Sequence, residues 1–122
     1  MGVRSIEVVS IPVSDQAWSK AFYAGSLGFT VDTDEAFAEN QRWVQLTPPG
    51  GGASISLVTW NPAMPPGAIK DLYLACTDID VTYNELVGRG VRFTQAVFDT
   101  PFGRFAHFED PDGNGWSLHE GA

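Results

Sequence analysis

The sequence predicts an α+β fold made of two copies of one βαβββ module. Three observations lead to this prediction. A helix cap, an amphipathic helix, a glycine stop and a new strand follow one another twice, over residues 15–29 and 78–91. A proline-rich segment at 61–69 behaves as a linker between the copies. A turn rich in Pro and Gly at 110–115 joins the last two expected strands.

The first module is expected to span about residues 4–60. Residues 5–13 alternate with period two, which is typical of a strand. Ser14 and Asp15 are then placed to cap a helix, and Gly28 to end it. The buried stripe of this helix is expected to contain Trp18, Ala21, Phe22 and Gly25. Further strands are expected around residues 29–31, 42–47 and 53–59.

The second module is expected to span about residues 70–120. An apolar strand at 72–76 precedes a helix that either Asp78 or Asp80 can cap, and Gly88 and Gly90 stop that helix. Its buried stripe is expected to contain Ile79, Tyr83, Leu86 and Val87, and Trp116 is assigned to the core with Trp18. Strands follow at 91–98, 104–109 and 116–120. One helix and four strands bury one face of a sheet, so two modules must pair, within one chain or between chains.

Composition limits the classes of function. With 122 residues and 43 % hydrophobic residues, we expect one domain over 1–122, and the absence of a long apolar run argues against a membrane span. A net charge of −8 disfavours nucleic acid and favours cationic ligands. The lone Cys76 cannot form an internal disulfide and is interpreted as a buried structural thiol, which agrees with a cytoplasmic location.

Five motifs, taken in order, resemble signatures of one known family. They are Ile11-Pro12-Val13-Ser14-Asp15, Ala21-Phe22-Tyr23 with Leu27-Gly28-Phe29, Thr77-Asp78, Gly90-Val91, and Phe108-Glu109-Asp110-Pro111-Asp112-Gly113-Asn114. Their order resembles the vicinal-oxygen-chelate superfamily of glyoxalases, bleomycin-resistance proteins and extradiol dioxygenases. The resemblance implies paired βαβββ modules that form a cup-shaped mixed sheet around a cavity, and a homodimer in which the modules of two chains complete each other's cavities.

The resemblance also points to four positions at which metal-binding members carry His or Glu. In this sequence these positions are Val8, Ser56, Asp71 and Ser117. Valine cannot coordinate a cation and serine is a poor neutral ligand, so we expect no metal and no other cofactor. A divalent metal bound through relocated ligands stays an alternative.

Side chains at alternate positions of the same strands are expected to line the cavity: Val8, Ser10, Ser54, Ser56, Asp71, Tyr73, Ser117 and His119. Asp71 and His119 could act together as base and orienting group, or could simply be solvated strand residues. Arg104 could bind a carboxylate or phenolate, or be solvated. The sequence does not assign His107 to either face of its strand. Four aromatic residues could rim a cleft and stack on a flat ligand, or pack in the core: Trp43, Trp60, Phe98 and Phe102.

The leading hypothesis is a small-molecule-binding protein without a metal, which sequesters a flat or cationic molecule or an antibiotic. The alternative is a glyoxalase-like or dioxygenase-like lyase or isomerase, which depends on a metal or works without one through Asp71 and His119. A protein-interaction module with the same fold is a third reading. The sequence leaves open whether the protein is an enzyme, and it does not name a ligand.

Overall fold

The computed structural model describes residues 2–121, so the ends of the predicted domain, residues 1 and 122, lie outside the described part. Backbone contacts divide the chain into two compact units, of which unit 1 ends at Pro66 and unit 2 begins at Gly67. This boundary falls inside the proline-rich segment. Within residues 2–121, no helix is long and apolar enough to cross a membrane.

Unit 1 has the order strand, helix, then three strands. Its elements are β1 (Val8–Pro12), α1 (Gln16–Ala21), the π-helical segment η1 (Phe22–Ser26), β2 (Thr30–Ala38), β3 (Gln41–Thr47) and β4 (Ser54–Val58). The strands form one mixed sheet in the order β1-β4-β3-β2, with β1 parallel to β4 and the other pairs antiparallel. One face of this sheet supplies the buried side chains Ile11, Val44, Leu46 and Leu57.

Unit 2 repeats this architecture. Its elements are β5 (Leu72–Ala75), α2 (Ile79–Gly88), β6 (Arg92–Thr100), β7 (Gly103–Glu109) and β8 (Gly115–Gly121). The sheet order is β5-β8-β7-β6, again with one parallel pair, β5 and β8. The two four-stranded mixed sheets confirm the predicted α+β class and the repeated βαβββ module.

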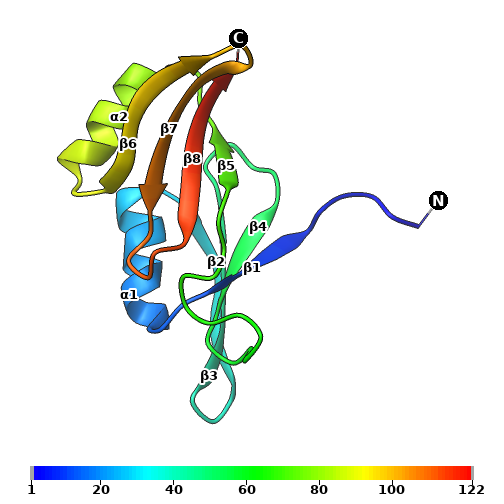
Figure 1. Ribbon diagram of the computed structural model, residues 1–122. Coiled ribbons are helices and arrows are strands. Elements are labelled where there is room, and N and C mark those ends of the chain that lie inside the picture. The colour runs from blue at the N-terminus through cyan, green and yellow to red at the C-terminus, as the bar shows by residue number, and fades with distance from the viewer. Residues whose placement is uncertain (1, 122) are drawn as a thin grey trace. The chain divides into compact units, whose positions relative to one another are not determined.

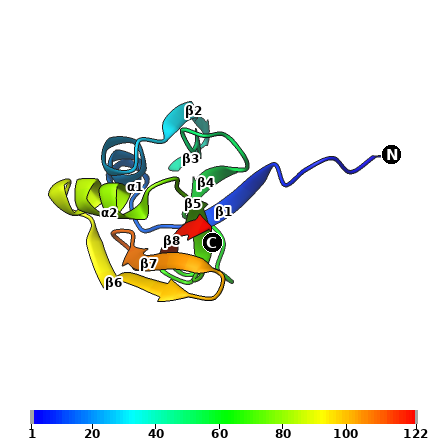
Figure 2. The same ribbon diagram turned by 90° about the horizontal axis from the view of Figure 1, so that it is seen from above.

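The core of unit 2 lies between α2 and one face of its sheet (Figures 1 and 2). The ring of Tyr83 from α2 lies 4.5 Å from that of Phe93, measured between ring centroids, and Phe93 in turn contacts Phe108 at 5.4 Å. Trp116 lies parallel to Phe108 at 6.4 Å, and both side chains are buried, which confirms the core assignment of Trp116.

The helix caps are formed by aspartates, as the sequence predicts. The Asp15 carboxylate accepts a hydrogen bond from the Trp18 backbone N–H at 2.9 Å, and the Asp78 carboxylate accepts one from the Val81 N–H at 3.2 Å. Of the two candidates for the second cap, the structure therefore selects Asp78. These caps fix where each helix leaves its preceding strand.

The predicted buried stripe of the first helix is wrong. Trp18 is 56 % exposed, and the buried side chains are instead Ser19 and Tyr23. Ser19 is small and polar, so a search for apolar residues at helical spacing does not identify this buried face. In addition, the Leu27 N–H bonds to the Phe22 carbonyl, five residues earlier, so the helix leaves the 3.6-residue period on which the prediction relied.

The turn between β7 and β8 is organised by the buried Asp110 side chain. One carboxylate oxygen accepts hydrogen bonds from the backbone N–H groups of Asp112 and Asn114, both at 2.9 Å, and the other accepts from Asn114 Nδ2 at 2.8 Å. The Asn114 side-chain oxygen accepts from the Ile69 N–H at 3.2 Å. Gly113 has a φ of 91°, which favours glycine. The turn thereby fixes the register of β7 on β8.

Candidate functional site

The face of the unit 2 sheet opposite α2 carries a cluster of rings. Strand register places His107 opposite Ser117 and Phe105 opposite His119, and β6 adds Phe98 opposite Phe105. Strand β5 adds Tyr73 opposite Ser117. Directly paired residues point to the same face of a sheet. We call this set the aromatic face; it consists of Tyr73, Phe98, Phe105, His107, Ser117 and His119.

Phe105 lies at the centre of the aromatic face. Its ring stacks on that of His119 with centroids 4.4 Å apart and planes 12° apart, and on Phe98 at 6.0 Å. Tyr73 meets Phe105 edge-on at 6.1 Å, and Phe98 contacts His107 at 5.2 Å. Tyr73 is 60 % exposed, whereas the four other rings are half-buried. Such a surface can bind a flat aromatic molecule by stacking.

Both histidines of the aromatic face are held by hydrogen bonds. His107 Nδ1 lies 2.6 Å from the Ser117 hydroxyl, which is itself buried. His119 Nε2 lies 2.9 Å from the Phe102 carbonyl oxygen. A carbonyl oxygen only accepts, so Nε2 of His119 carries the proton, and in the neutral ring Nδ1 is an acceptor. The rings therefore present fixed orientations to a ligand.

The structure does not bring Asp71 and His119 together. His119 pairs with Ala75, near the end of β5. Asp71 lies four residues before Ala75, just ahead of this strand. Four residues of strand correspond to about 13 Å. Asp71 also has a φ of 60°, a turn conformation at the start of the strand. His119 instead uses the Phe102 carbonyl as its partner.

Arg104 lies on the other face of the same sheet. Its guanidinium bonds to Asp80 of α2 at 2.7 Å and to Asp99 of β6 at 2.9 Å. The hydrogen bonds that Arg104 donates to Asp80 and then Asp99 raise the pKa of Arg104 above its ordinary value. Phe102 lies in the turn between β6 and β7, and its side chain is 78 % exposed. Its carbonyl oxygen contacts His119, so Phe102 lies beside the aromatic face. Of the predicted binding residues in unit 2, Arg104 is thus separated from Tyr73, His107 and Ser117.

The predicted site residues of unit 1 that lie in strands share one sheet face. Register pairs Val8 with Ser54 and Ser10 with Ser56. Gln45 pairs with Ser56 and accepts a hydrogen bond from Trp43 Nε1 at 2.9 Å, so Trp43 belongs to this face as well. This is a mainly polar surface that contrasts with the aromatic face of unit 2.

Two hydroxyls on this surface differ in their environment. The Ser54 hydroxyl is hydrogen-bonded to that of Thr47 at 2.8 Å, and Thr47 also bonds to the Asp32 carboxylate. The Ser56 hydroxyl is buried and has no hydrogen-bond partner among residues 2–121. A buried polar atom without a partner is a place where a water molecule or ligand group gains a hydrogen bond. Trp60 follows β4, and its ring meets Phe37 edge-on at 5.2 Å.

Sequence reasoning missed Phe105, the central ring of the aromatic face. The signal was present in the 110–115 turn. If β7 and β8 are paired outward from that turn, Phe108 meets Trp116, His107 meets Ser117 and Phe105 meets His119, as observed. The same counting would have settled the face of His107, which the sequence left open. Sequence reasoning also missed the ion pairs that Asp34 forms with Lys20 and Arg42 in unit 1.

Comparison with known proteins identifies relatives over the whole chain. The model of the Glyoxalase/Bleomycin resistance protein/Dioxygenase superfamily matches residues 5–118. The uncharacterized protein YetH of Bacillus subtilis is 30 % identical over 121 residues, which is 97 % of this chain and 99 % of YetH.

Solved structures agree with this relationship. TnmS3, an antibiotic binding protein from Streptomyces sp. CB03234, is 38 % identical, with a TM-score of 0.93 over 100 % of this chain and 99 % of TnmS3. A superfamily member from Sphaerobacter thermophilus is 33 % identical, with a TM-score of 0.87 over 98 % of this chain and 99 % of its own.

Proposed function

Because this chain belongs to the Glyoxalase/Bleomycin resistance protein/Dioxygenase superfamily, we propose that it binds a flat aromatic small molecule on the aromatic face of unit 2. The observation that carries the proposal is the cluster of five rings that has Phe105 at its centre and Tyr73 exposed at its edge. The similarity to TnmS3, described as an antibiotic binding protein, supports a ligand of antibiotic type.

A cationic ligand is favoured over an anionic one. Residues 67–122 contain nine acidic residues and four basic ones, so the field around unit 2 is negative. Electron-rich ring faces also attract cations. Arg104 of the same sheet lies on the face toward α2 and is paired there with the acidic groups of Asp80 and Asp99. We therefore propose a flat cation or neutral molecule as the ligand.

We propose that this binding requires no metal. The positions at which metal-binding relatives are expected to hold the ion carry Val8, Ser56, Asp71 and Ser117, a set with one carboxylate and no imidazole. The Ser117 hydroxyl is engaged by His107. Among residues 2–121, no group of three or more His, Cys, Asp and Glu side chains is arranged to hold a metal ion. This donor set does not fit a divalent cation.

Three flat tricyclic probes of different charge test the proposal: proflavine, acridone and acridine-9-carboxylate. Fluorescence titration should give saturable binding in the order proflavine, acridone, acridine-9-carboxylate. Phe105→Leu removes the central ring and should weaken proflavine binding by about 1–2 kcal/mol, or roughly 5–30-fold. Phe37→Leu, which removes an exposed ring of unit 1, should leave the affinity unchanged. Equal affinities for the wild type and Phe105→Leu would refute the proposal.

We also propose that the protein forms a homodimer, since each βαβββ unit covers one face of its sheet with a helix and leaves the other open to a partner. Light scattering at several concentrations tests this. A mass of 13.2 kDa at all concentrations, the mass of one chain, would contradict it.

A further inference from the structure

Unit 1 contains a pocket between α1 and the strands β2 and β3. It has a volume of about 310 Å³, at the lower end of the range for small-molecule sites. All of its lining residues belong to unit 1: Gln16, Ala17, Lys20, Ala21, Ala24, Asp34, Arg42 and Val44. It shares no residue with the aromatic face, whose residues all belong to unit 2.

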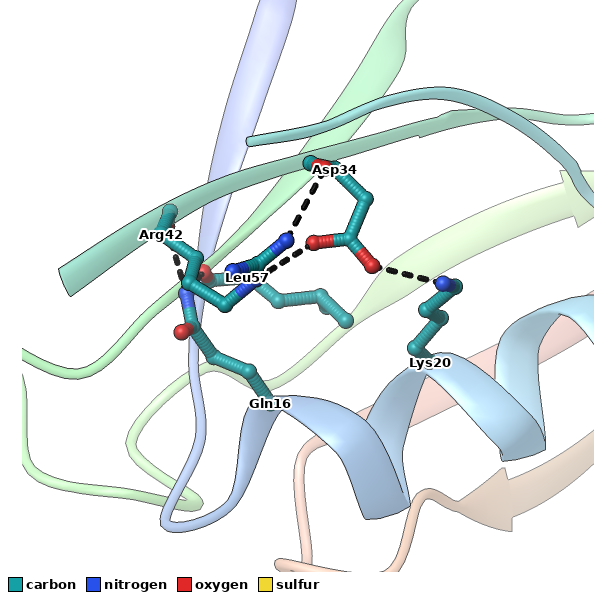
Figure 3. A network of polar contacts seen from close by, with 5 residues as sticks. All are labelled: Gln16, Lys20, Asp34, Arg42 and Leu57. Atoms are coloured by element: carbon teal, nitrogen blue, oxygen red, sulfur yellow. Dashed lines mark hydrogen bonds and ion pairs between the residues drawn. The ribbon is translucent and has the colours of Figure 1, made fainter. Parts of the chain in front are cut away.

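The sequence of the helix explains why there is space at this place. Ala17 and Ala21 lie one helical turn apart on α1, Ala24 follows in the π-helical segment η1, and all three line the pocket. Their methyl groups are too small to fill the gap above Val44. Gln16 keeps the helix at this distance, because its side-chain amide donates to the carbonyl oxygens of Arg42 and Leu57, each at 2.7 Å (Figure 3).

The rim of this pocket has an excess of positive charge. Asp34 receives hydrogen bonds from Lys20 Nζ at 2.6 Å and from Arg42 Nε at 2.7 Å, and its carbonyl oxygen accepts from Arg42 Nη2 at 3.0 Å (Figure 3). Hydrogen bonds from Lys20 and then Arg42 hold the pKa of Asp34 below its ordinary value, so the carboxylate is ionised near neutrality. Two cations thus share one anion, in a chain with only seven basic residues and a net charge of −8.

Both cations have donors left for a second anion. An ammonium group has three N–H donors and a guanidinium group has five, whereas the contacts with Asp34 use one and two of them. The side chains of Lys20 and Arg42 are 36 % and 49 % exposed, so a ligand in the pocket can reach them. Apart from Gln16 and Asp34, the remaining walls are the apolar side chains of Ala17, Ala21, Ala24 and Val44. The pocket therefore offers cationic donors for an anion beside an apolar wall.

From this arrangement we infer that the pocket binds a small amphipathic carboxylate. The carboxylate bonds to Lys20 and Arg42 beside Asp34, and the apolar body of the ligand covers Ala17, Ala21 and Val44. This site goes beyond the proposed aromatic-ligand function and does not depend on it, since no residue is shared.

Octanoate is a suitable probe, with acetate as the head group alone. In two-dimensional NMR titrations of the full chain, octanoate should shift the amide signals of Ala17, Lys20, Ala21 and Arg42 in a saturable way, with a Kd on the order of 1 mM. Acetate should bind more weakly, because it lacks the apolar body. Shifts confined to other residues, or no saturation with octanoate, would overturn the inference.

Substitutions test separately how the charges and the cavity contribute to octanoate affinity. Asp34→Asn releases both cations and should tighten octanoate binding by about threefold or more, within the usual size of charge-assisted contacts. Its matched control is Glu109→Gln, which releases Arg92 from a 3.0 Å ion pair in unit 2, where Arg92 is 71 % exposed, and should change nothing. An equal effect of both substitutions would show a general charge effect and overturn the inference.

Two further variants should weaken binding for different reasons. Ala21→Leu fills the pocket and keeps both cations, and leucine retains the helix propensity of this exposed position. Lys20→Gln keeps the cavity and removes the surplus charge. Each should lower octanoate affinity at least fivefold while the far-UV circular dichroism spectrum stays that of the wild type. Unchanged affinity in either folded variant would contradict the assigned site.

Discussion

Replacement of Asp110 tests whether its carboxylate organises the turn that sets the β7–β8 register. The side chain is buried and accepts three hydrogen bonds, from the Asp112 and Asn114 backbones and from the Asn114 amide. Asp110→Ala leaves three donors without this acceptor, each at a cost of about 1–3 kcal/mol if water does not replace it. We expect a loss of about 3–6 kcal/mol, a large part of the stability of a typical domain.

Asp110→Asn provides the graded comparison. Its carbonyl oxygen can still accept from the two backbone N–H groups, while its amide faces the Asn114 amide and loses that one bond. We expect a loss of about 1–3 kcal/mol. Urea denaturation followed by Trp fluorescence and circular dichroism measures both values. The reasoning fails if Asp110→Ala costs less than about 1 kcal/mol, or if the two variants are equally destabilised.

Three further predictions concern single side chains. Asp78→Ala removes the acceptor for the Val81 N–H and should cost about 1 kcal/mol in thermal or urea unfolding, whereas Asp78→Ser, which retains a capping oxygen, should cost much less; equal losses would contradict the cap. Because the folded-state pKa of Asp34 is lowered, the stability it contributes is present above its ordinary pKa of 3.8 and is lost as the pH falls below that value. The difference in urea midpoint between wild type and Asp34→Asn should therefore be constant from pH 5 to 7 and shrink below pH 3.8, and a difference independent of pH would be inconsistent with the ion pairs. Burial, followed by the nearby charges of Glu120 and Asp78, raises the pKa of the Cys76 thiol, so iodoacetamide should alkylate it more slowly at pH 8 than the same thiol in urea; equal rates would refute this.

The strands and the turns were predictable because their signals are local. Period-two alternation and the glycines after both helices indicated the strands and helices of the repeated module, although β2 extends to Ala38, well beyond the expected residues 29–31, and the π-helical segment η1 was not expected. Gly28 and Gly90 have positive φ values of 77° and 85°. These signals depend on neighbours within a few residues along the chain. The placement of Tyr73, Ser117 and His119 on one face rested instead on the family resemblance, whose positions were extended along each strand with period two.

The remaining features depend on contacts between distant segments. The ring cluster around Phe105 combines residues of four strands, β5, β6, β7 and β8, so its members come together only through strand pairing. Arg104 has the character of a ligand-binding residue, but α2 brings Asp80 to it across 24 positions of sequence. The Lys20–Asp34 ion pair joins residues 14 positions apart in different elements. Composition and residue spacing do not show that these oppositely charged side chains meet in the folded protein.

The most direct test of the central claim is to locate proflavine on the protein. Intermolecular nuclear Overhauser effects in the saturated complex should connect acridine ring protons to Tyr73, Phe105 and His119, because Tyr73 is exposed and both its ring and that of His119 contact Phe105 at the centre of the aromatic face. A complex that saturates but shows such contacts only to residues of unit 1 would contradict the account.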